Sequence, residues 1–566
     1  MAEAKSAPFQ GEWTNPGLSP RQIKLTLIGV MLAMFLASLD QTIVATAIPR
    51  IMADLDGFDR VTWVSSAYIV ASTSVVLITG AVSDVYGRKW LFVAGIAIFL
   101  LGSVLAAMSP SMNALIISRG VQGLGGGMIF ALSFVTIGDL FPPAERAKYQ
   151  GIIAAMFGIS SVLGPTLGGF ITDQFSWEWI FLVNIPLGIP VIFLFIRLFP
   201  NTKRDGPKRK IDVGGAVLIV ATIVPALLGL SWGGNQYEWS DPLVMGSLAL
   251  GGIMLVVFAL YETRISEPIL PLAVFKNRIV GIALLVTLLM GFAMFGAIFF
   301  VPLLFQGVLG ASPTASGSFL TPMMLGIVAG AAISGQVLSR TGGHYRIQGM
   351  IGLSVMAIGT FMLSRVDGDT THAYALTSAV IMGFGLGTSF PLYTIAIQNG
   401  VPQQYLGVAT SSAQFFRSVG GSIGLAVFGS YMVKQFKDGM QTNLPNEVFE
   451  AVPPETLAVI TSNPNALLNA ESSNTLRDAF AASGEAGVVL GEQVFTAIRE
   501  SLAGSIGDVF FLSFIFVVLG VVATAFIREV PLRSRGRPSG GPDGGPDDGP
   551  SDGVAPDSKS AGSDSE

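Results

Sequence analysis

Cysteine is absent from the 566-residue sequence, and charged residues are scarce, at 12% of the chain. The lack of cysteine excludes disulfides, thiolate metal sites and cysteine nucleophiles. The scarcity of charge excludes an ordinary soluble domain, in which roughly a quarter of the residues are charged. Apolar residues fill the chain instead: they make up 51% of it, and the mean hydropathy is +0.63. This composition indicates an integral membrane protein.

Other absences limit the chemistry. The two histidines, His344 and His372, lie far apart and have no acidic or histidine cluster at ligand spacing, so we expect no metal site and no catalytic triad. The glycines from Gly123 to Gly127 follow no strand and lie inside an apolar run, which excludes a nucleotide-binding loop there. We therefore expect no enzyme, no cofactor and no nucleic-acid partner, and an ion or substrate gradient as the energy source for any transport.

Long apolar runs predict membrane-spanning helices. A helix needs about 20 mostly apolar residues to cross a hydrocarbon layer of roughly 30 Å, whereas barrel strands alternate over about 10 residues. We predict an all-α membrane protein with fourteen spans near residues 22–45, 61–82, 90–108, 112–138, 150–172, 179–199, 212–231, 243–261, 279–304, 316–338, 347–364, 373–399, 408–432 and 509–527. Ser19 and Pro20 are a suitable cap and first turn for the first helix.

The distribution of basic residues predicts the orientation, because cytoplasmic loops hold an excess of Lys and Arg. With the N-terminus inside, the cytoplasmic segments include Arg88 and Lys89 and the basic cluster 203–210, whereas the short outer loops hold only Arg50, Arg60 and Arg365. Both termini are predicted to be cytoplasmic, in a multi-pass protein of the cell membrane.

The spans group into a domain plan of two bundles with an insertion. We expect a cytoplasmic segment 1–21, a six-helix bundle 22–200, a linker 201–278 with two inserted helices, and a second six-helix bundle 279–528. An outer loop, 433–508, belongs to the second bundle; it is either a surface for a protein partner or a solvated loop, with a helix near 494–502 running into the last span. The acidic tail 529–566 is rich in Gly, Pro, Ser and Asp and is predicted to be disordered.

Three ionisable residues stand well inside predicted spans: Asp40, Arg119 and Arg417. A charge inside a membrane span is costly and is a candidate for function. Helical rise places Asp40 and Arg119 at a similar depth in the outer half. A carboxylate that alternates between a guanidinium and an apolar pocket can carry a proton, although a static pair would only fix helix packing. Arg417 has no evident acidic partner in its own half, so it faces a substrate, a lipid headgroup or a cavity, or bonds to the backbone.

Several motifs resemble those of the major facilitator superfamily. GAVSDVYGRKWL (80–91) is similar to its loop signature, RGVQGLGGG (119–127) to its fourth-helix motif and GPTLGG (164–169) to its antiporter motif. LDQTIVATAIP (39–49) resembles the first-helix motif of the fourteen-helix drug:proton antiporter branch, in which the aspartate is implicated in proton coupling. ETRISEPILPLAVFKNR (262–278) and FRSVGGSIGLAVFG (416–429) are also similar to that branch. The resemblance covers nearly all of residues 20–528 and implies the fold of multidrug efflux transporters.

The loop motif and the antiporter motif also have physical interpretations. The turn allowed by Gly87 holds Asp84 near Arg88 and Lys89, where they can make charge contacts between bundles as a gate; alternatively, the two cations only obey the positive-inside rule. Gly80 also matches the loop signature of the family. Val85 does not, because a basic residue often follows the aspartate in that signature. In the fifth span, Gly164, Gly168 and Gly169 are expected to admit a neighbouring backbone, and Pro165 to kink the helix.

The prediction for function is a proton-driven secondary transporter that exports small apolar or cationic drug-like compounds by alternating access. Asp40 and Arg119 are the predicted proton-coupling residues. Alternatives are an exporter of lipids or lipid-like metabolites and a non-transporting membrane receptor. Membrane lipids surround the spans in each case. The candidates for the substrate site or cavity are Gln122, Arg417, Met290, Met294 and Phe295. For Met290, Met294 and Phe295, the alternative is a stripe of residues that faces lipid or the protein core.

Overall fold

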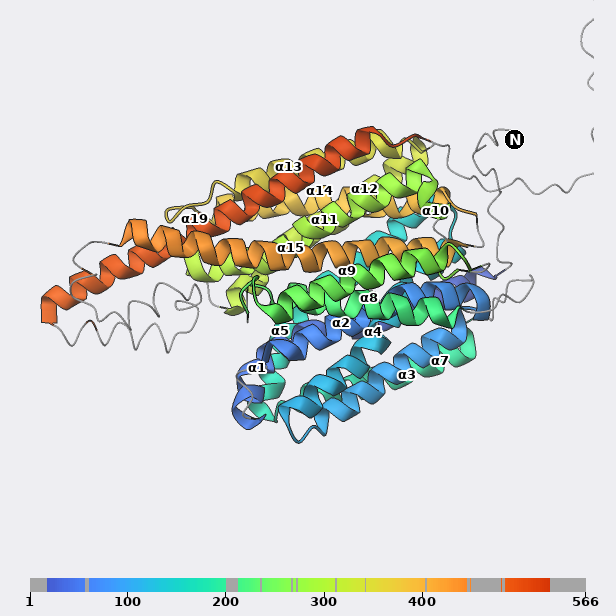
Figure 1. Ribbon diagram of the computed structural model, residues 1–566, viewed down its shortest axis with the longest axis horizontal. Helices are drawn as coiled ribbons and strands as arrows, with labels where there is room; N and C mark the ends of the chain where they lie inside the picture. The colour runs from blue at the N-terminus through green and yellow to red at the C-terminus, as the bar shows by residue number, and fades with distance from the viewer. Residues whose placement is uncertain are drawn as a thin grey trace, which may run out of the picture.

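The computed structural model describes residues 18–55, 61–199, 212–234, 237–265, 268–270, 273–310, 313–341, 343–402, 405–444, 448, 480 and 484–529. In this part of the chain the helices run side by side along the long axis of the molecule (Figure 1). Helices suit a membrane because each satisfies its own backbone N–H and C=O groups where no water is present. The expected all-α fold class is confirmed.

The N-terminal half comprises α1 (Pro20–Leu55), α2 (Val61–Tyr86), α3 (Arg88–Ala107), α4 (Met112–Leu140), α5 (Pro143–Gln174) and the pair α6 (Trp179–Leu182) and α7 (Asn184–Leu198). The first helix begins where the sequence predicts. Ser19 Oγ accepts from Gln22 N at 3.3 Å, while Gln22 Oε1 accepts from Ser19 N at 3.0 Å. This reciprocal capping box satisfies two backbone donors that a helix start leaves free.

Two helices follow in the segment 201–278: α8 (Val213–Trp232) and α9 (Pro242–Glu262). Asp212 and Asp241 cap them, each accepting from a backbone N–H at 2.8 Å. The α8 helix packs against α9 on one side and against α2 and α15 (Leu406–Asn443) on the other. The α8 helix thus contacts both halves where α2 of the first packs against α15 of the second.

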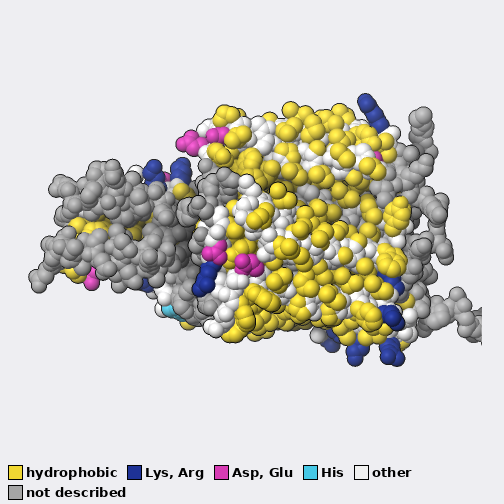
Figure 2. All heavy atoms as spheres, turned by 90° about the horizontal axis from the view of Figure 1, so that it is seen from below, with side chains coloured by type: hydrophobic (Ala, Val, Ile, Leu, Met, Phe, Trp, Pro, Cys, Tyr) yellow, Lys and Arg dark blue, Asp and Glu magenta, His cyan; other side chains and the backbone are white. Residues whose placement is uncertain are grey.

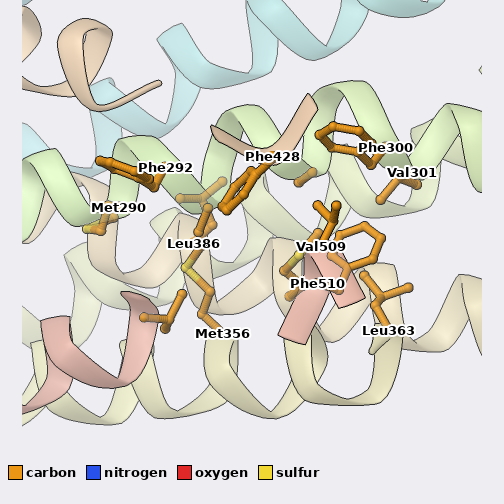
Figure 3. Packing of buried hydrophobic residues seen from close by; sticks show 14 of the residues in the cluster. Met290, Phe292, Phe300, Val301, Met356, Leu363, Leu386, Phe428, Val509 and Phe510 are labelled. Carbon is orange, nitrogen blue, oxygen red and sulfur yellow. The ribbon is translucent and has the colours of Figure 1, made fainter. Parts of the chain in front are cut away.

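The C-terminal half comprises α10 (Ala273–Lys276), α11 (Arg278–Leu303), the π-helical turn η2 (Leu304–Val308), α12 (Pro313–Arg340), α13 (Tyr345–Leu363), α14 (His372–Asn399), α15 and α19 (Gly484–Ala525). Its buried side chains form one large cluster, in which Phe292, Phe428 and Phe510 pack between helices (Figure 3). Contacts between the halves join α12 to α5, α15 to α2 and α4, and α14 to α5.

The predicted number of spans agrees broadly with the structure. In the described part of the chain, thirteen helices are long and apolar enough to cross a membrane. The remaining predicted span, 408–432, lies within α15, which is long but carries more polar residues. Hydrophobic side chains cover the middle of the face in Figure 2, as a lipid-exposed belt requires, and many Lys and Arg side chains lie near its right-hand end.

The last two predicted spans are too short. The α15 helix continues to Asn443, and α19 begins at Gly484 rather than near residue 509. With 38 and 42 residues, and a rise of about 1.5 Å per residue, both exceed the roughly 30 Å of a hydrocarbon layer. They project together beyond the other helices (left in Figure 1). The helix expected near 494–502 is confirmed as part of α19, so both ends of segment 433–508 are helical; most of its middle lies outside the described residues, as does most of the tail 529–566.

Candidate functional site

The carboxylate of Asp40 lies fully buried in α1, 0% exposed, and accepts three hydrogen bonds. Arg119 Nη1 donates to Oδ2 at 2.6 Å, Gln122 Nε2 donates to Oδ1 at 2.7 Å, and Asn184 Nδ2 donates to Oδ1 at 2.8 Å. The donors come from α4 and α7, so the carboxylate joins three helices of the N-terminal half. The expected meeting of Asp40 and Arg119 is present.

The donors to Asp40 are themselves held in place. Ser103 Oγ on α3 accepts from Gln122 Nε2 at 2.7 Å and from Asn184 Nδ2 at 3.2 Å. Arg119 also donates to Gln122 Oε1 and, through Nε, to the carbonyl of Val64 at 3.3 Å. Second partners of this kind fix the orientation of a buried charged group and offset its desolvation. We call Asp40, Arg119, Gln122, Asn184 and Ser103 the Asp40 site.

Glycines allow this close approach of helices. A Cβ on Gly102 of α3 would collide with the backbone of Gln122, and a Cβ on Gly123 of α4 would collide with the backbone of Tyr68 of α2. The ring of Tyr68 lies 4.5 Å from the guanidinium carbon of Arg119. Gly102 therefore brings α3 against α4, and Gly123 of the fourth-helix motif brings α4 against α2.

Sequence reasoning missed two members of the Asp40 site, Asn184 and Ser103. Both are neutral, and a count of ionisable residues inside the spans passes over them. A signal was nevertheless present, because Asn184 is an amide in an otherwise apolar run, and a buried amide requires partners. Gln122, expected as a cavity candidate, is a buried partner of Asp40 in this structure, and its role in a cavity stays a prediction.

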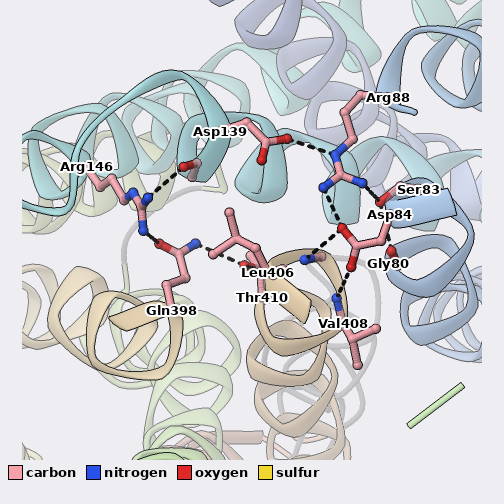
Figure 4. Close-up of polar contacts among 12 residues, drawn as sticks. Gly80, Ser83, Asp84, Arg88, Asp139, Arg146, Gln398, Leu406, Val408 and Thr410 are labelled. Carbon is pink, nitrogen blue, oxygen red and sulfur yellow. Dashed lines mark hydrogen bonds and ion pairs between the residues drawn. The ribbon is translucent and has the colours of Figure 1, made fainter. Parts of the chain in front are cut away.

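A second cluster joins the two halves at the end predicted to be cytoplasmic (Figure 4). Arg88 Nη2 contacts Asp84 Oδ1 at 2.6 Å, and its Nε contacts Asp139 Oδ2 of α4 at 2.9 Å. Asp84 also accepts, at 3.2 Å each, from the backbone N–H groups of Gly407 and Val408 at the start of α15. A carboxylate at a helix N-terminus interacts favourably with the helix dipole. Asp84 thus links α2 to the C-terminal half, and we call this cluster the Asp84 gate.

The glycines of the loop motif have distinct roles. Gly87 has a φ of 87°, a left-handed conformation that favours glycine, and it separates α2 from α3. A Cβ on Gly80 would collide with Ser411 of α15, so this glycine allows the halves to touch. Lys89 lies 5.9 Å over the ring of Trp90 and makes no ion pair among the described residues. The cationic part of the gate is Arg88.

Arg146 forms a further link between the halves that the sequence did not single out. Its Nη1 donates to Gln398 Oε1 of α14 at 2.8 Å, while Nε and Nη2 donate to the carbonyls of Phe141 and Gly138. Gln398 Nε2 donates in turn to Thr410 Oγ1 at 3.0 Å (Figure 4). These bonds lie at the same end of the molecule as the Asp84 gate, so the halves are closed there.

The antiporter motif lies on α5 beside α1. A Cβ on Gly164 would collide with Thr42, two residues after Asp40, so the expected close approach occurs there. Gly168 is buried. The same expectation is wrong for Gly169, because a Cβ on it would meet nothing within 4 Å. The α5 helix continues without a break through Pro165.

The apolar pocket candidates lie in packed surroundings. Met290 belongs to the hydrophobic core cluster of the C-terminal half (Figure 3). Phe295 packs its ring against Gly421 of α15, and Met294 is partly buried against the core cluster. Arg417 is 5% exposed and lies between the halves, over the rings of Phe390 and Phe134. A substrate role for these residues stays a prediction.

Comparison with known proteins identifies the family. The model of the Major Facilitator Superfamily matches residues 30–425, more than half of the chain. The chain belongs to this superfamily. It is therefore a multi-pass membrane transporter and not an enzyme, as the sequence predicts.

Within the superfamily the chain is similar to bacterial drug transporters. It is 36% identical to the multidrug transporter protein MdtP of Bacillus subtilis, over 91% of this chain and 95% of that protein. It is 34% identical to multidrug resistance protein 3 of the same organism, over 90% and 96%. The fold resembles that of the proton:xylose symporter XylE, with a TM-score of 0.54, 12% identity, and 90% and 97% of the two chains covered.

Proposed function

We propose that this superfamily member exports small apolar or cationic drug-like compounds in exchange for protons. Support for drug export comes from relatives at 36% and 34% identity that are named multidrug transport and resistance proteins. Support for the proton comes from the Asp40 site, which is the single observation that carries the proposal. We further propose that the protein lies in the plasma membrane with both termini in the cytoplasm, in accord with its basic residues.

Asp40 suits a proton carrier because it is a buried carboxylate whose partners come from two other helices. Three donors surround the carboxylate, and one of them, Arg119, carries a positive charge. Protonation would remove the negative charge and leave Arg119 buried with neutral partners only. Breaking a buried ion pair from one side costs about 3–5 kcal/mol. Such a change can drive a rearrangement of α1, α4 and α7.

The energy of a proton gradient is of matching size. One charge that crosses 100 mV gains about 2.3 kcal/mol, and a pH difference of one unit adds about 1.4 kcal/mol. One proton that moves down both gradients therefore supplies about 3.7 kcal/mol, which lies within the range of the cost of breaking the Asp40–Arg119 pair. In the proposed cycle, protonation of Asp40 from outside accompanies opening of the Asp84 gate toward the cytoplasm, and substrate binding there displaces the proton.

The test is proton-driven efflux of a cationic dye from vesicles that contain either wild type or Asp40→Asn at matched expression. Asparagine keeps the size of the side chain but cannot alternate between the two protonation states. We expect efflux by wild type that collapses with an uncoupler, and no coupled efflux by Asp40→Asn.

A matched control on the same helix is Asp54→Asn. Asp54 is exposed near the end of α1 and accepts from Trp177 Nε1 at 3.0 Å, a bond that asparagine preserves. We expect this variant to keep coupled efflux. Efflux that survives Asp40→Asn would exclude the carrier role, and a folded wild type that exports no dye would exclude drug-like cations as cargo.

A further inference from the structure

Arg417 is a buried cation inside the predicted span 408–432. It lies 11 residues from the first residue of α15, which corresponds to about 17 Å along the helix. Its exposed fraction is only 5%. A guanidinium at this depth is strongly disfavoured unless partners compensate for the loss of water.

The other buried arginines have such partners. Arg88 contacts two carboxylates, and Arg119 contacts one carboxylate, one amide and one carbonyl. Arg146 donates to two carbonyls and an amide oxygen. For Arg417, the bond found among the described residues runs from Nη2 to Gln414 Oε1, one turn away on its own helix. No ion pair in that part of the chain includes Arg417.

Two aromatic rings lie close to the Arg417 guanidinium. Its central carbon lies 3.9 Å from the ring centre of Phe390 on α14 and 5.5 Å from that of Phe134 on α4. The two rings lie 5.9 Å apart. Stacking uses the face of the guanidinium, whereas its five N–H donors point outward in the plane. In the described part of the chain the fork donates one hydrogen bond, to Gln414, so other N–H donors remain available to an acceptor.

The position between the halves matters as much as the charge. Phe134 belongs to the N-terminal half, and Phe390 and Arg417 belong to the C-terminal half. The contacts of the Asp84 gate and of Arg146 lie closer to the predicted cytoplasmic end, so Arg417 lies just beyond the closed layer. In transporters built from two halves, cargo binds near the midplane between them.

We propose that Arg417 binds the anionic group of an amphipathic cargo, a carboxylate, phosphate or sulfonate, while Phe390 and Phe134 pack against its apolar body. The inference rests on the proposed export function and adds a class of substrate to it. A guanidinium fork matches the geometry of these oxoanions, and an anion supplies the counter-charge that the described residues do not. A small organic acid and an anionic lipid share this chemistry.

Binding to the purified full-length protein tests the proposal independently of proton coupling. Carboxyfluorescein and rhodamine 6G are xanthene dyes of opposite charge, and fluorescence anisotropy gives the Kd of each. We expect Arg417→Gln to weaken carboxyfluorescein binding at least tenfold and rhodamine 6G binding less than threefold. Arg417→Lys keeps the charge without the fork, so we expect an intermediate loss for the anion. Thermal unfolding and size-exclusion profiles establish that each variant folds.

A second arm distinguishes the two sources of the anion. A fluorescent lysophosphatidylglycerol replaces the dye in the same binding measurement, and in efflux from vesicles. Binding of the dye alone identifies an organic acid as cargo, and Arg417-dependent binding of the lipid identifies a headgroup.

Equal weakening of both xanthene dyes by Arg417→Gln would overturn the proposal, and so would a wild type that binds neither anionic probe. Should Arg417→Gln not fold, carboxyfluorescein binding left unchanged by Arg417→Lys would also overturn it. Cationic dye efflux that depends on Asp40 would still stand in all these cases, so the two proposals fail separately.

Discussion

Replacing Asp84 with asparagine should open the Asp84 gate. In the structure, the Asp84 carboxylate accepts from the backbone N–H groups of Gly407 and Val408 on the other half of the molecule. Asparagine has one acceptor oxygen and no charge, so at least one of these bonds is lost and the other is weakened. The contact with Arg88 stays within one half, and its loss therefore affects the closed and open states alike.

The size of the effect follows from the bonds between the halves. A hydrogen bond to a charged group contributes about 1.5–3 kcal/mol, and a charge at a helix N-terminus contributes about 0.3–1 kcal/mol. The closed state should therefore lose about 2–4 kcal/mol relative to the open state. Since 1.4 kcal/mol corresponds to a factor of ten, a ratio of closed to open molecules of about 99:1 would fall to about 3:1 or below.

Spin labels can measure this ratio directly, because the sequence contains no cysteine that would have to be removed first. Lys148 on α5 and Arg340 on α12 are exposed and lie on opposite halves, so labels on cysteines at these positions report their separation. We expect Asp84→Asn to add a population at longer distance. The matched control is Asp139→Asn, which removes a partner of Arg88 within the N-terminal half. An unchanged distance distribution in Asp84→Asn, or an equal shift in Asp139→Asn, would refute the reasoning.

Three further substitutions test the packing and the hydrogen bonds of the N-terminal half. Gly164→Ala should lower the thermal unfolding midpoint, because overpacking against Thr42 costs about 1–3 kcal/mol, whereas Gly169→Ala meets no atom and should leave the midpoint unchanged or raise it. An equal loss in both variants would contradict the packing interpretation. Asn184→Leu removes a donor to a buried carboxylate and should destabilise the protein by about 1.5–3 kcal/mol, and it should also slow Asp40-dependent dye efflux. Asn184→Leu with wild-type stability and efflux would mean that the bond to Asp40 contributes little.

Much of the fold could be predicted from the sequence because membranes impose simple rules. Apolar run length predicted the spans, and the capping pattern at Ser19 predicted the start of α1. The same rules failed for α15 and α19, because a helix that leaves the membrane no longer needs an apolar sequence. The predicted spans therefore stop where the apolar sequence stops. The α15 helix, however, continues to Asn443, and α19 already begins at Gly484.

The candidate site was only partly predictable for a related reason. Charges inside apolar runs stand out, so Asp40 and Arg119 could be paired from helical rise alone. Neutral partners such as Asn184 and Gln398 resemble ordinary polar residues until the helices are placed next to each other. Gly169 shows the opposite error: its sequence motif predicted a close packing contact, but a Cβ on this residue would meet no atom within 4 Å.

The α4 helix connects the two clusters that the proposed cycle requires to act together. Near one end, Arg119 and Gln122 hold the carboxylate of Asp40. At the other end, Asp139 contacts Arg88 of the Asp84 gate, and the carbonyl of Gly138 accepts from Arg146. Twenty residues separate Arg119 from Asp139, about 30 Å of continuous helix. Because a helix transmits a tilt or a shift along its axis with little internal change, protonation of Asp40 can reach the gate through α4 without any contact between the two clusters.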